Sequence, residues 1–139
     1  MRIMTENITL STQGDMDIAD ITPQVSKKLK SSGLKDGIVN LNVCGSTAAL
    51  TTCEYEPGLI QDLKDIFEKL IPQGKRYHHD EAWHDGNGHA HLRASLVGPS
   101  LTLPFHKGAL TLGTWQQIIF VDFDNRPRQR SIALQFIGE

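Results

Sequence analysis

Short stretches of alternating apolar and polar residues recur along the chain, and such alternation is typical of half-buried β-strands. Residues 2–10 alternate enough for a first strand, and residues 37–43 (GIVNLNV) for a second. Residues 47–53 (TAALTTC) are interpreted as the partner of the second strand, in a hairpin that turns at Gly45-Ser46. The first third of the chain therefore predicts strands at each of these places.

Strand-like runs dominate the C-terminal half, where they cover residues 100–105, 109–112, 116–123 and 130–137. Turns at Lys107-Gly108 and at residues 124–127 separate them. Because sequential strands joined by short turns pair antiparallel, we expect mostly antiparallel sheets.

Two segments carry helical signals instead. Thr22 and Pro23 open a helix, with the threonine as its cap and the proline at its first position, and Gly33 ends it. Residues 57–71 predict a second helix because their apolar side chains share one face, namely Leu59, Leu63, Ile66, Phe67 and Leu70. Residues 89–97 suit either a short helix or a strand.

Length and composition fit an ordinary globular protein with one domain over residues 1–139. We expect an α+β fold with a mostly antiparallel, β-sandwich-like core and two or three packed helices. The formal net charge of −2 offers no basic field for a phosphate backbone, so nucleic-acid binding is disfavoured. No apolar run reaches the roughly 18 residues of a membrane span, and the polar segment 1–14 lacks the apolar stretch expected of a signal peptide. Neither feature points to a membrane, and we expect a cytoplasmic location.

The cysteines, Cys44 and Cys53, are expected to be free thiols. In the predicted hairpin Cys53 lies about seven residues along the return strand, which places it roughly 20 Å away at about 3.3 Å per residue. A disulfide requires Cα atoms within about 7 Å of each other. Free thiols suit a reducing compartment.

Five of the 6 histidines fall within residues 77–91, in the sequence YHHDEAWHDGNGHAH. Imidazole and carboxylate groups bind divalent metals and transfer protons near neutral pH, so an active site is expected here. His89 and His91 would share one face of a strand and could also converge in an extended loop. His79 could fold back across the turn at residues 85–88 as a third ligand, which would leave an open position as in catalytic zinc sites. The alternative is a loop of exposed histidines and acids without an ion.

Other positions are candidates for binding or catalysis. Glu54 follows the predicted strand 47–53, and strand ends that lead into loops commonly carry catalytic groups. In an extended segment Arg93 would lie on the same side as His89 and His91, where it could hold a phosphate. Arg126, Arg128 and Arg130 occupy alternate positions, which share one face of a strand, and could bind an anion. The favoured interpretation is that they form a solvated face or salt bridges between subunits.

Several segments together resemble the YjbQ family, also called UPF0047 or the secondary thiamine-phosphate synthase family, in its archaeal form. They are GSTAALTTCEYEPGL (45–59), YHH (77–79), DGNGHAHLRASLVGPSLTLP (85–104), GALTLGTWQQI (108–118) and RPRQR (126–130). The resemblance covers nearly the whole chain. It departs at Gly45, where many bacterial members have a histidine.

The resemblance implies β-sheets with helices packed outside, a homotrimer, and a polar site near subunit boundaries that binds metal or anions in some members. Seven residues fall on positions of the family's motifs: Glu54, His79, Asn87, His89, His91, Thr114 and Gln116. We therefore expect Glu54 and Asn87 to be catalytic. Substrate binding is assigned to Arg93, Thr114 and Gln116. A divalent metal, zinc or magnesium, is assigned to His79, His89 and His91.

Three functions are compatible with these patterns. The activity that the family name implies is synthesis of thiamine phosphate, in which a pyrimidine diphosphate ester loses pyrophosphate and a thiazole phosphate nitrogen takes its place. The first hypothesis is therefore an enzyme that binds a phosphorylated small molecule. The second is a metal-dependent hydrolase, because zinc bound by three histidines is more typical of hydrolysis. The third is a non-catalytic trimeric module that binds a metal or an anion.

Overall fold

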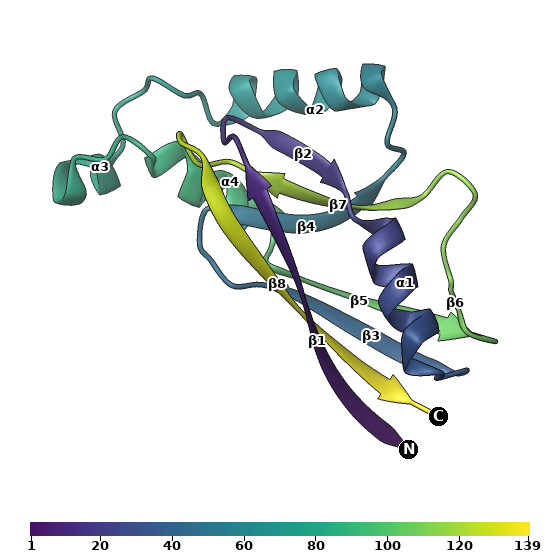
Figure 1. Cartoon of the computed structure of the whole chain (residues 1–139). Coiled ribbons are helices and arrows are strands. Elements are labelled where there is room, and N and C mark those ends of the chain that lie inside the picture. The colour runs from purple at the N-terminus through teal and green to yellow at the C-terminus, as the bar shows by residue number, and fades with distance from the viewer.

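A computed structural model describes residues 1–139 and contains two antiparallel sheets. The larger sheet has five strands, in the order β1 (Arg2–Thr12), β8 (Arg128–Gly138), β3 (Gly37–Val43), β5 (Ser100–His106) and β6 (Ala109–Leu110). The smaller sheet has three strands, in the order β2 (Asp17–Asp20), β7 (Gln117–Asp122) and β4 (Ala48–Cys53). Figure 1 shows both sheets, and together with the helices they confirm the predicted α+β class.

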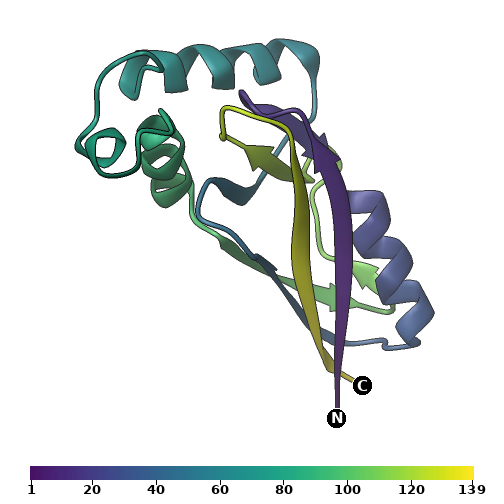
Figure 2. The same cartoon turned by 60° about the vertical axis from the view of Figure 1, so that its left-hand side comes forward.

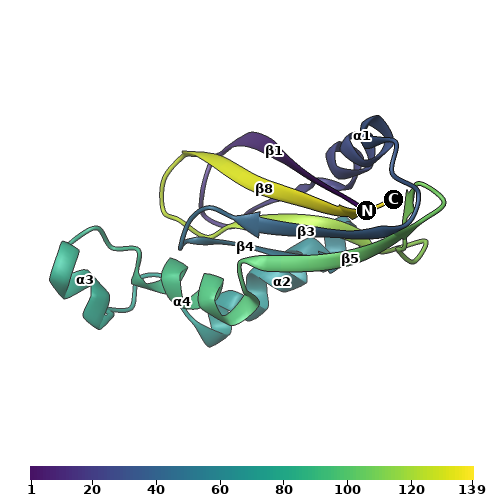
Figure 3. The same cartoon turned by 90° about the horizontal axis from the view of Figure 1, so that it is seen from below.

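Four helices complete the chain: α1 (Thr22–Ser32), α2 (Pro57–Leu70), α3 (His78–Trp83) and α4 (Gly88–Val97). In Figure 1, α2 runs above the smaller sheet, α1 lies on the right beside β6, and α3 projects on the far left. The view from below in Figure 3 also places α3 at the edge of the molecule, beyond α4. No helix is both long enough and apolar enough to cross a membrane.

The smaller sheet is the middle of three layers, because strand β7 is apolar on both faces. Ile118 and Phe120 belong to the main core, which lies between the sheets and includes Phe136 of β8. Ile119 and Val121 belong to a second core, against which α2 packs with Ile60, Leu63 and Phe67. An apolar run without alternation, IIFV, therefore predicts a strand that is covered on both sides.

The longest pairing joins the two ends of the chain. β1 and β8 pair over their whole lengths, from Arg2 opposite Gly138 to Thr12 opposite Arg128. The termini consequently lie together at the bottom of Figure 2, and the opposite ends of these strands reach the smaller sheet. This pairing brings Thr12 and the arginines of β8 next to the carboxyl end of β7.

The predicted hairpin between residues 37–43 and 47–53 is wrong, although both strands exist. β3 pairs with β5 and β8, whereas β4 pairs with β7 in the other sheet. The four residues between them carry the chain from one sheet to the other, and the pattern of apolar positions does not reveal such a change. Cys44 and Cys53 are free thiols, as expected, but they lie in different layers and not along one hairpin.

The helices follow the local signals with two exceptions. Gly33 ends α1 in the left-handed region at φ +73°, as predicted. Thr22 does not cap this helix, because its Oγ1 accepts a hydrogen bond from the Ile118 N–H at 2.8 Å and so ties α1 to β7. Residues 78–83, expected to be part of a loop, form the short helix α3.

Candidate functional site

The histidine-rich segment folds into two helices joined by a turn, and one carboxylate holds them together. Asp80 in α3 accepts hydrogen bonds from the N–H groups of Gly88 (2.9 Å) and Tyr77 (3.3 Å). These bonds, the Gly88 one above all, hold the pKa of the Asp80 carboxyl below its ordinary value. A Cβ at position 88 would lie only 2.7 Å from Cβ of Tyr77, so the close approach of the two helices requires glycine there.

His89 and His91 lie on different faces of α4. Residues two apart in an α-helix are separated by about 200° around its axis, so the two rings cannot share a side as they would in a strand. His89 faces the interior and is 1% exposed. His91 is partly exposed and faces α3. Of the alternatives left open for this segment, the helix is confirmed.

His79 and His91 form the imidazole pair of the segment. Their ring centroids are 4.2 Å apart, with an angle of 55° between the planes. They line a cavity of about 270 Å³ together with Tyr77, Gly88 and Leu92. Burial and then the neighbouring His79 hold the pKa of His91 below the ordinary histidine value, so His91 is neutral at pH 7.

The three histidines assigned to a metal do not converge within one chain. His79 and His91 could each offer a nitrogen to the cavity between them, whereas His89 is turned to the other side of α4. No group of three His, Cys, Asp or Glu side chains in residues 1–139 has the spacing to hold an ion. One chain therefore offers a metal two imidazole ligands, from His79 and His91. The remaining ligands would have to come from substrate, water or a neighbouring chain.

Two buried polar atoms at the start of α4 have no hydrogen-bond partner in the protein: Oδ1 of Asn87 and Nε2 of His89. Such atoms are rare in folded proteins, because leaving a buried polar group unpaired costs about 1–3 kcal/mol. Burial, followed by the charge of Arg93, holds the pKa of His89 below its ordinary value. Position 89 therefore carries a neutral imidazole at pH 7, with an atom free to bond a ligand.

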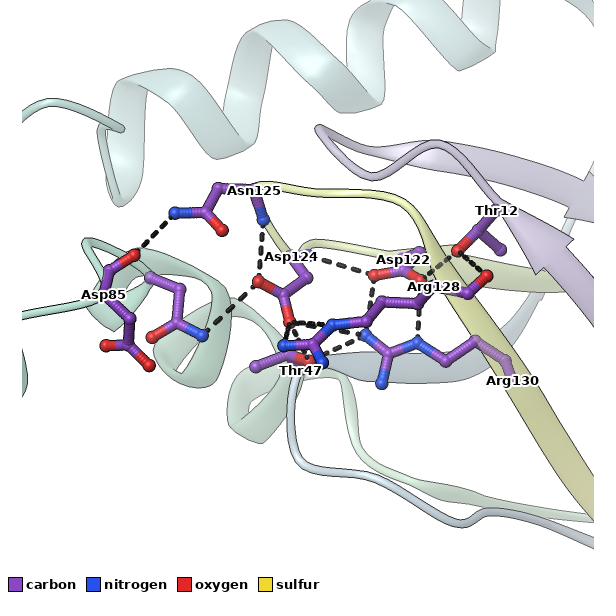
Figure 4. Close-up of polar contacts among 9 residues, drawn as sticks. Thr12, Thr47, Asp85, Asp122, Asp124, Asn125, Arg128 and Arg130 are labelled. Atoms are coloured by element: carbon purple, nitrogen blue, oxygen red, sulfur yellow. Dashed lines mark hydrogen bonds and ion pairs between the residues drawn. The ribbon is translucent and has the colours of Figure 1, made fainter. Parts of the chain in front are cut away.

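A buried network of charges lies beside these atoms, at the turn between β7 and β8 (Figure 4). Arg130 donates from Nε (2.7 Å) and Nη2 (2.8 Å) to the carboxylate of Asp122, which also accepts from Thr12. Arg128 donates from Nε to Asp124 Oδ2 at 3.0 Å. The favoured sequence interpretation of these arginines, a solvated face or a set of subunit salt bridges, is therefore corrected, and only Arg126 of the three is exposed.

Asp124 connects this network to the histidine segment. Its Oδ1 accepts from Nδ2 of Asn87 at 3.3 Å, and its Oδ2 accepts from the Thr47 hydroxyl at 3.0 Å. Burial alone would raise the pKa of Asp124, but hydrogen bonds from Asn125, Thr47, Asn87 and Arg128 outweigh it and the pKa is lowered. The carboxylate is thus charged at neutral pH and orients the Asn87 amide.

Sequence reasoning missed Thr47, Asp122 and Asp124, although a signal for the two acids was present. Both aspartates stand in the apolar strand sequence FVDFD. A carboxylate on a strand that is buried on both sides must be paired, and the arginines of RPRQR follow within a few residues. Thr47 carried no comparable signal, because its role depends on contacts with residues far along the chain.

Arg93 is buried, and its Nε and Nη2 donors are used within the protein. Nε and Nη2 donate to the carbonyl oxygen of Ile71 at 3.0 and 2.8 Å, and Nη2 also contacts Glu68 at 3.0 Å. These bonds attach the end of α2 to α4. Arg93 lies four residues after His89 on the same helix face, so its charge acts on the imidazole.

The remaining assigned residues lie at the other end of the smaller sheet. Cys53 pairs with Gln117 and Ala48 with Asp122, so Glu54 and Gln116 adjoin the start of β7 while Asp124 adjoins its end. About six residues at roughly 3.3 Å each place these ends roughly 20 Å apart. Gln116 donates to Thr52 at 3.0 Å, and both Glu54 and Thr114 are exposed. Figure 1 shows this separation, with α3 on the left and the loop before β7 on the right.

Comparison with known proteins agrees with the resemblance. The family model described as "UPF0047 protein YjbQ-like" matches residues 6–139. A UPF0047 protein of Archaeoglobus fulgidus is 42% identical over 128 residues, covering 92% of this chain and 97% of the relative. A UPF0047 protein of Methanothermobacter thermautotrophicus is 37% identical, covering 100% of this chain and 95% of the relative.

Solved structures of similar sequence have the same fold. A YbjQ-like protein of unknown function from Sulfolobus solfataricus superimposes with a TM-score of 0.94 at 33% identity, with 99% of each chain covered. A hypothetical protein from Aeropyrum pernix gives a TM-score of 0.91 at 34% identity, covering 98% of this chain and 99% of that one. Sequence and structure agree over the whole length, and the chain belongs to the UPF0047 (YjbQ-like) family.

Proposed function

We propose that this protein is an enzyme that binds a phosphorylated small molecule at the start of α4, with thiamine-phosphate synthesis as the reaction. The observation that carries the proposal is the pair of buried, unpartnered atoms, Asn87 Oδ1 and His89 Nε2. A ligand that supplied one donor and one acceptor would remove both unpaired groups at once. A cavity of about 270 Å³ lies at the same end of α4, lined by His79, Gly88 and His91, although His89 faces the other side of the helix.

The chemistry of these groups suits displacement of pyrophosphate. A neutral imidazole with its proton on Nε2 would donate to an oxygen of the departing pyrophosphate and stabilise its developing charge. Asn87 Oδ1 would accept from an amino group, such as that of the pyrimidine, while its Nδ2 stays bonded to Asp124. Asp124 and Arg128 would act as positioning residues, since they hold the amide in this orientation.

The direct test is an assay of the purified protein with the pyrimidine diphosphate and the thiazole phosphate together. We expect thiamine phosphate and pyrophosphate to form in equal amounts. Omission of the thiazole phosphate is the control, because it distinguishes synthesis from simple hydrolysis of the diphosphate. Absence of thiamine phosphate at every ratio of precursors would reject this reaction.

A metal-dependent hydrolase is the second candidate, and the closeness of His79 and His91 favours it. Their imidazoles would hold zinc, or magnesium together with carboxylates, and the metal would supply activated water. Elemental analysis of protein purified without chelator tests this candidate. If the His79→Ala/His91→Ala variant carries as much metal as the wild type, these two histidines are not ligands of the metal.

We further propose that a complete site uses residues of two protomers of a homotrimer. Glu54 and His89 lie at opposite ends of the smaller sheet, so one chain cannot bring both to the same ligand. In a ring, the same two ends of neighbouring copies can meet, because each head-to-tail contact joins different surfaces. The expected location remains the cytoplasm.

Mixed oligomers test this arrangement. Glu54→Gln and His89→Asn chains, each inactive alone, are refolded together in equal amounts. Sites shared between chains should regain about one quarter of wild-type turnover, since random mixing leaves that fraction of contacts with both native residues. Wild-type protein that is unfolded and refolded in the same way serves as the reference for refolding. A mixture as inactive as either variant would confine the site to one chain, and an unaltered rate for Glu54→Gln alone would exclude Glu54 from it.

A further inference from the structure

The largest cavity of the protein lies far from the histidine segment, residues 77–91. It has a volume of about 650 Å³ and is bordered by α1, the turn between β5 and β6, and the loop before β7. We call it the lysine cavity, because Lys30, Lys35 and Lys107 line it. Its lining residues come partly from α1 and β6, which lie at the opposite end of Figure 1 from α3.

The positive charge of the lysine cavity is not balanced by ion pairs. None of its three lysines has a carboxylate within 4.0 Å, whereas Lys28 on the same helix pairs with Glu6. Asp36 lies nearby, but its carboxylate contacts the ring of His106 and the N–H of Lys107. In a protein with a formal net charge of −2, three unpaired ammonium groups around one cavity form a local site for an anion.

The neutral part of the lining combines free hydroxyls with an apolar floor. Ser26 and Thr114 line the cavity, and neither hydroxyl has a hydrogen-bond partner in the protein. Leu29 of α1, Leu34 of the loop that follows it and Leu110 of β6 lie beneath the cavity, with Leu29 and Leu34 each 1% exposed. Small-molecule sites typically measure about 300–1,000 Å³ and combine an apolar wall with a few polar groups. The size and the lining of this cavity both agree with that description.

We propose that the lysine cavity binds a small molecule that carries one or more phosphates, with the phosphates among the lysines and an apolar or aromatic body on the leucines. Ammonium groups bind phosphate through charge-assisted hydrogen bonds. Binding here requires neither the reaction proposed above nor the histidines. It also gives Thr114 a ligand to contact, although this residue lies far from the histidine segment of its own chain.

Pyrophosphate is the probe, because it carries the charge without the body. Binding to the full chain is measured by calorimetry and located by amide NMR. We expect millimolar or tighter binding, with the largest shifts at Gly108, Gly113 and Thr114. The Lys30→Gln/Lys35→Gln variant should bind about tenfold more weakly or worse, since it removes two charge-assisted contacts. The matched control, Lys27→Gln/Lys69→Gln, changes the net charge equally at exposed positions away from the cavity.

The two variants distinguish binding in the lysine cavity from a general effect of net charge. If both variants bind pyrophosphate equally weakly, the effect comes from net charge alone and the proposal is overturned. Shifts confined to residues 77–91, or no binding at millimolar pyrophosphate, would overturn it as well. A protein that makes no thiamine phosphate but binds pyrophosphate at Gly108 and Thr114 would reject the proposed reaction and support the lysine cavity.

Discussion

Replacing Asp122 by asparagine is expected to lower the free energy of unfolding by about 3–5 kcal/mol, because it leaves a buried guanidinium without its nearest counter-charge, with only Asp124 at 3.8 Å remaining. Asp122 is 0% exposed and accepts two hydrogen bonds from Arg130, at 2.7 and 2.8 Å. Asparagine keeps the shape but offers one oxygen and no charge. Urea unfolding followed by circular dichroism measures the change. Asp62→Asn, on the exposed side of α2, is the matched control and should stay within about 0.5 kcal/mol of wild type.

A second variant distinguishes lost pairing from lost packing. Asp122→Leu/Arg130→Met removes both charges and should recover much of the stability lost by Asp122→Asn, since apolar replacements of buried ion pairs are often neutral or stabilising.

Acid should also lower the free energy of unfolding, because protonation removes the charge of Asp122 as the single substitution does. Burial raises the pKa of Asp122, but hydrogen bonds from Arg130 and Thr12 outweigh it and lower the pKa below 3.8. This stabilisation is therefore complete above pH 3.8 and lost as the pH falls through the lowered value. A loss below about 1 kcal/mol for Asp122→Asn would contradict this account.

Replacing His89 by asparagine is expected to reduce the turnover of thiamine-phosphate formation by about 10²–10³-fold, the usual range for loss of one positioned donor to a developing anion. The prediction rests on the proposed function and on the unpartnered Nε2 of His89. Steady-state rates with both precursors measure it. His84→Asn is the matched control: His84 is exposed and has φ +57°, a conformation that asparagine tolerates well. Its rate should equal that of wild type.

The pH dependence gives a readout that a purely structural role would not change. Burial and then Arg93 lower the pKa of His89, so the ring stays neutral to below the ordinary value of 6.5. Protonation keeps the Nε2–H donor and adds positive charge, so the rate should rise as the pH falls through the lowered pKa of His89, below pH 6.5, and this rise should disappear in His89→Asn. A pH dependence unchanged in the variant, or full turnover in the variant, would assign the unpaired atoms to structure alone, with an ordered water as their partner.

The strands and helices were largely predictable, because their signals are local. Alternation over 37–43 and the apolar face of residues 57–70 appear within a single element. The hairpin between β3 and β4 failed because alternation reports that one face is buried, but not which strand lies alongside. α3 was missed because six residues are too few for a helical period to stand out from a polar loop.

The structure brings together only some of the residues that the sequence assigned to one site, and the reason is geometric. The histidine segment does hold two unpartnered polar atoms and an imidazole pair. The predicted set of three metal ligands assumed an extended chain, and the α4 helix turns His89 away from His91. Arg93 and Glu54 were grouped with the histidines by residue type, although one holds α2 to α4 and the other lies at the far end of β4.

The sequence by itself determined the α+β class, the extents of most elements, the free cysteines and the family, because each depends on local periodicity or on motifs read in order. Only the tertiary structure decided which strands pair, which aspartates neutralise which arginines, and which histidines meet. Those contacts join residues up to 110 positions apart, as between Thr12 and Asp122. Their energies come from burial and pairing in three dimensions, which no single stretch of chain records.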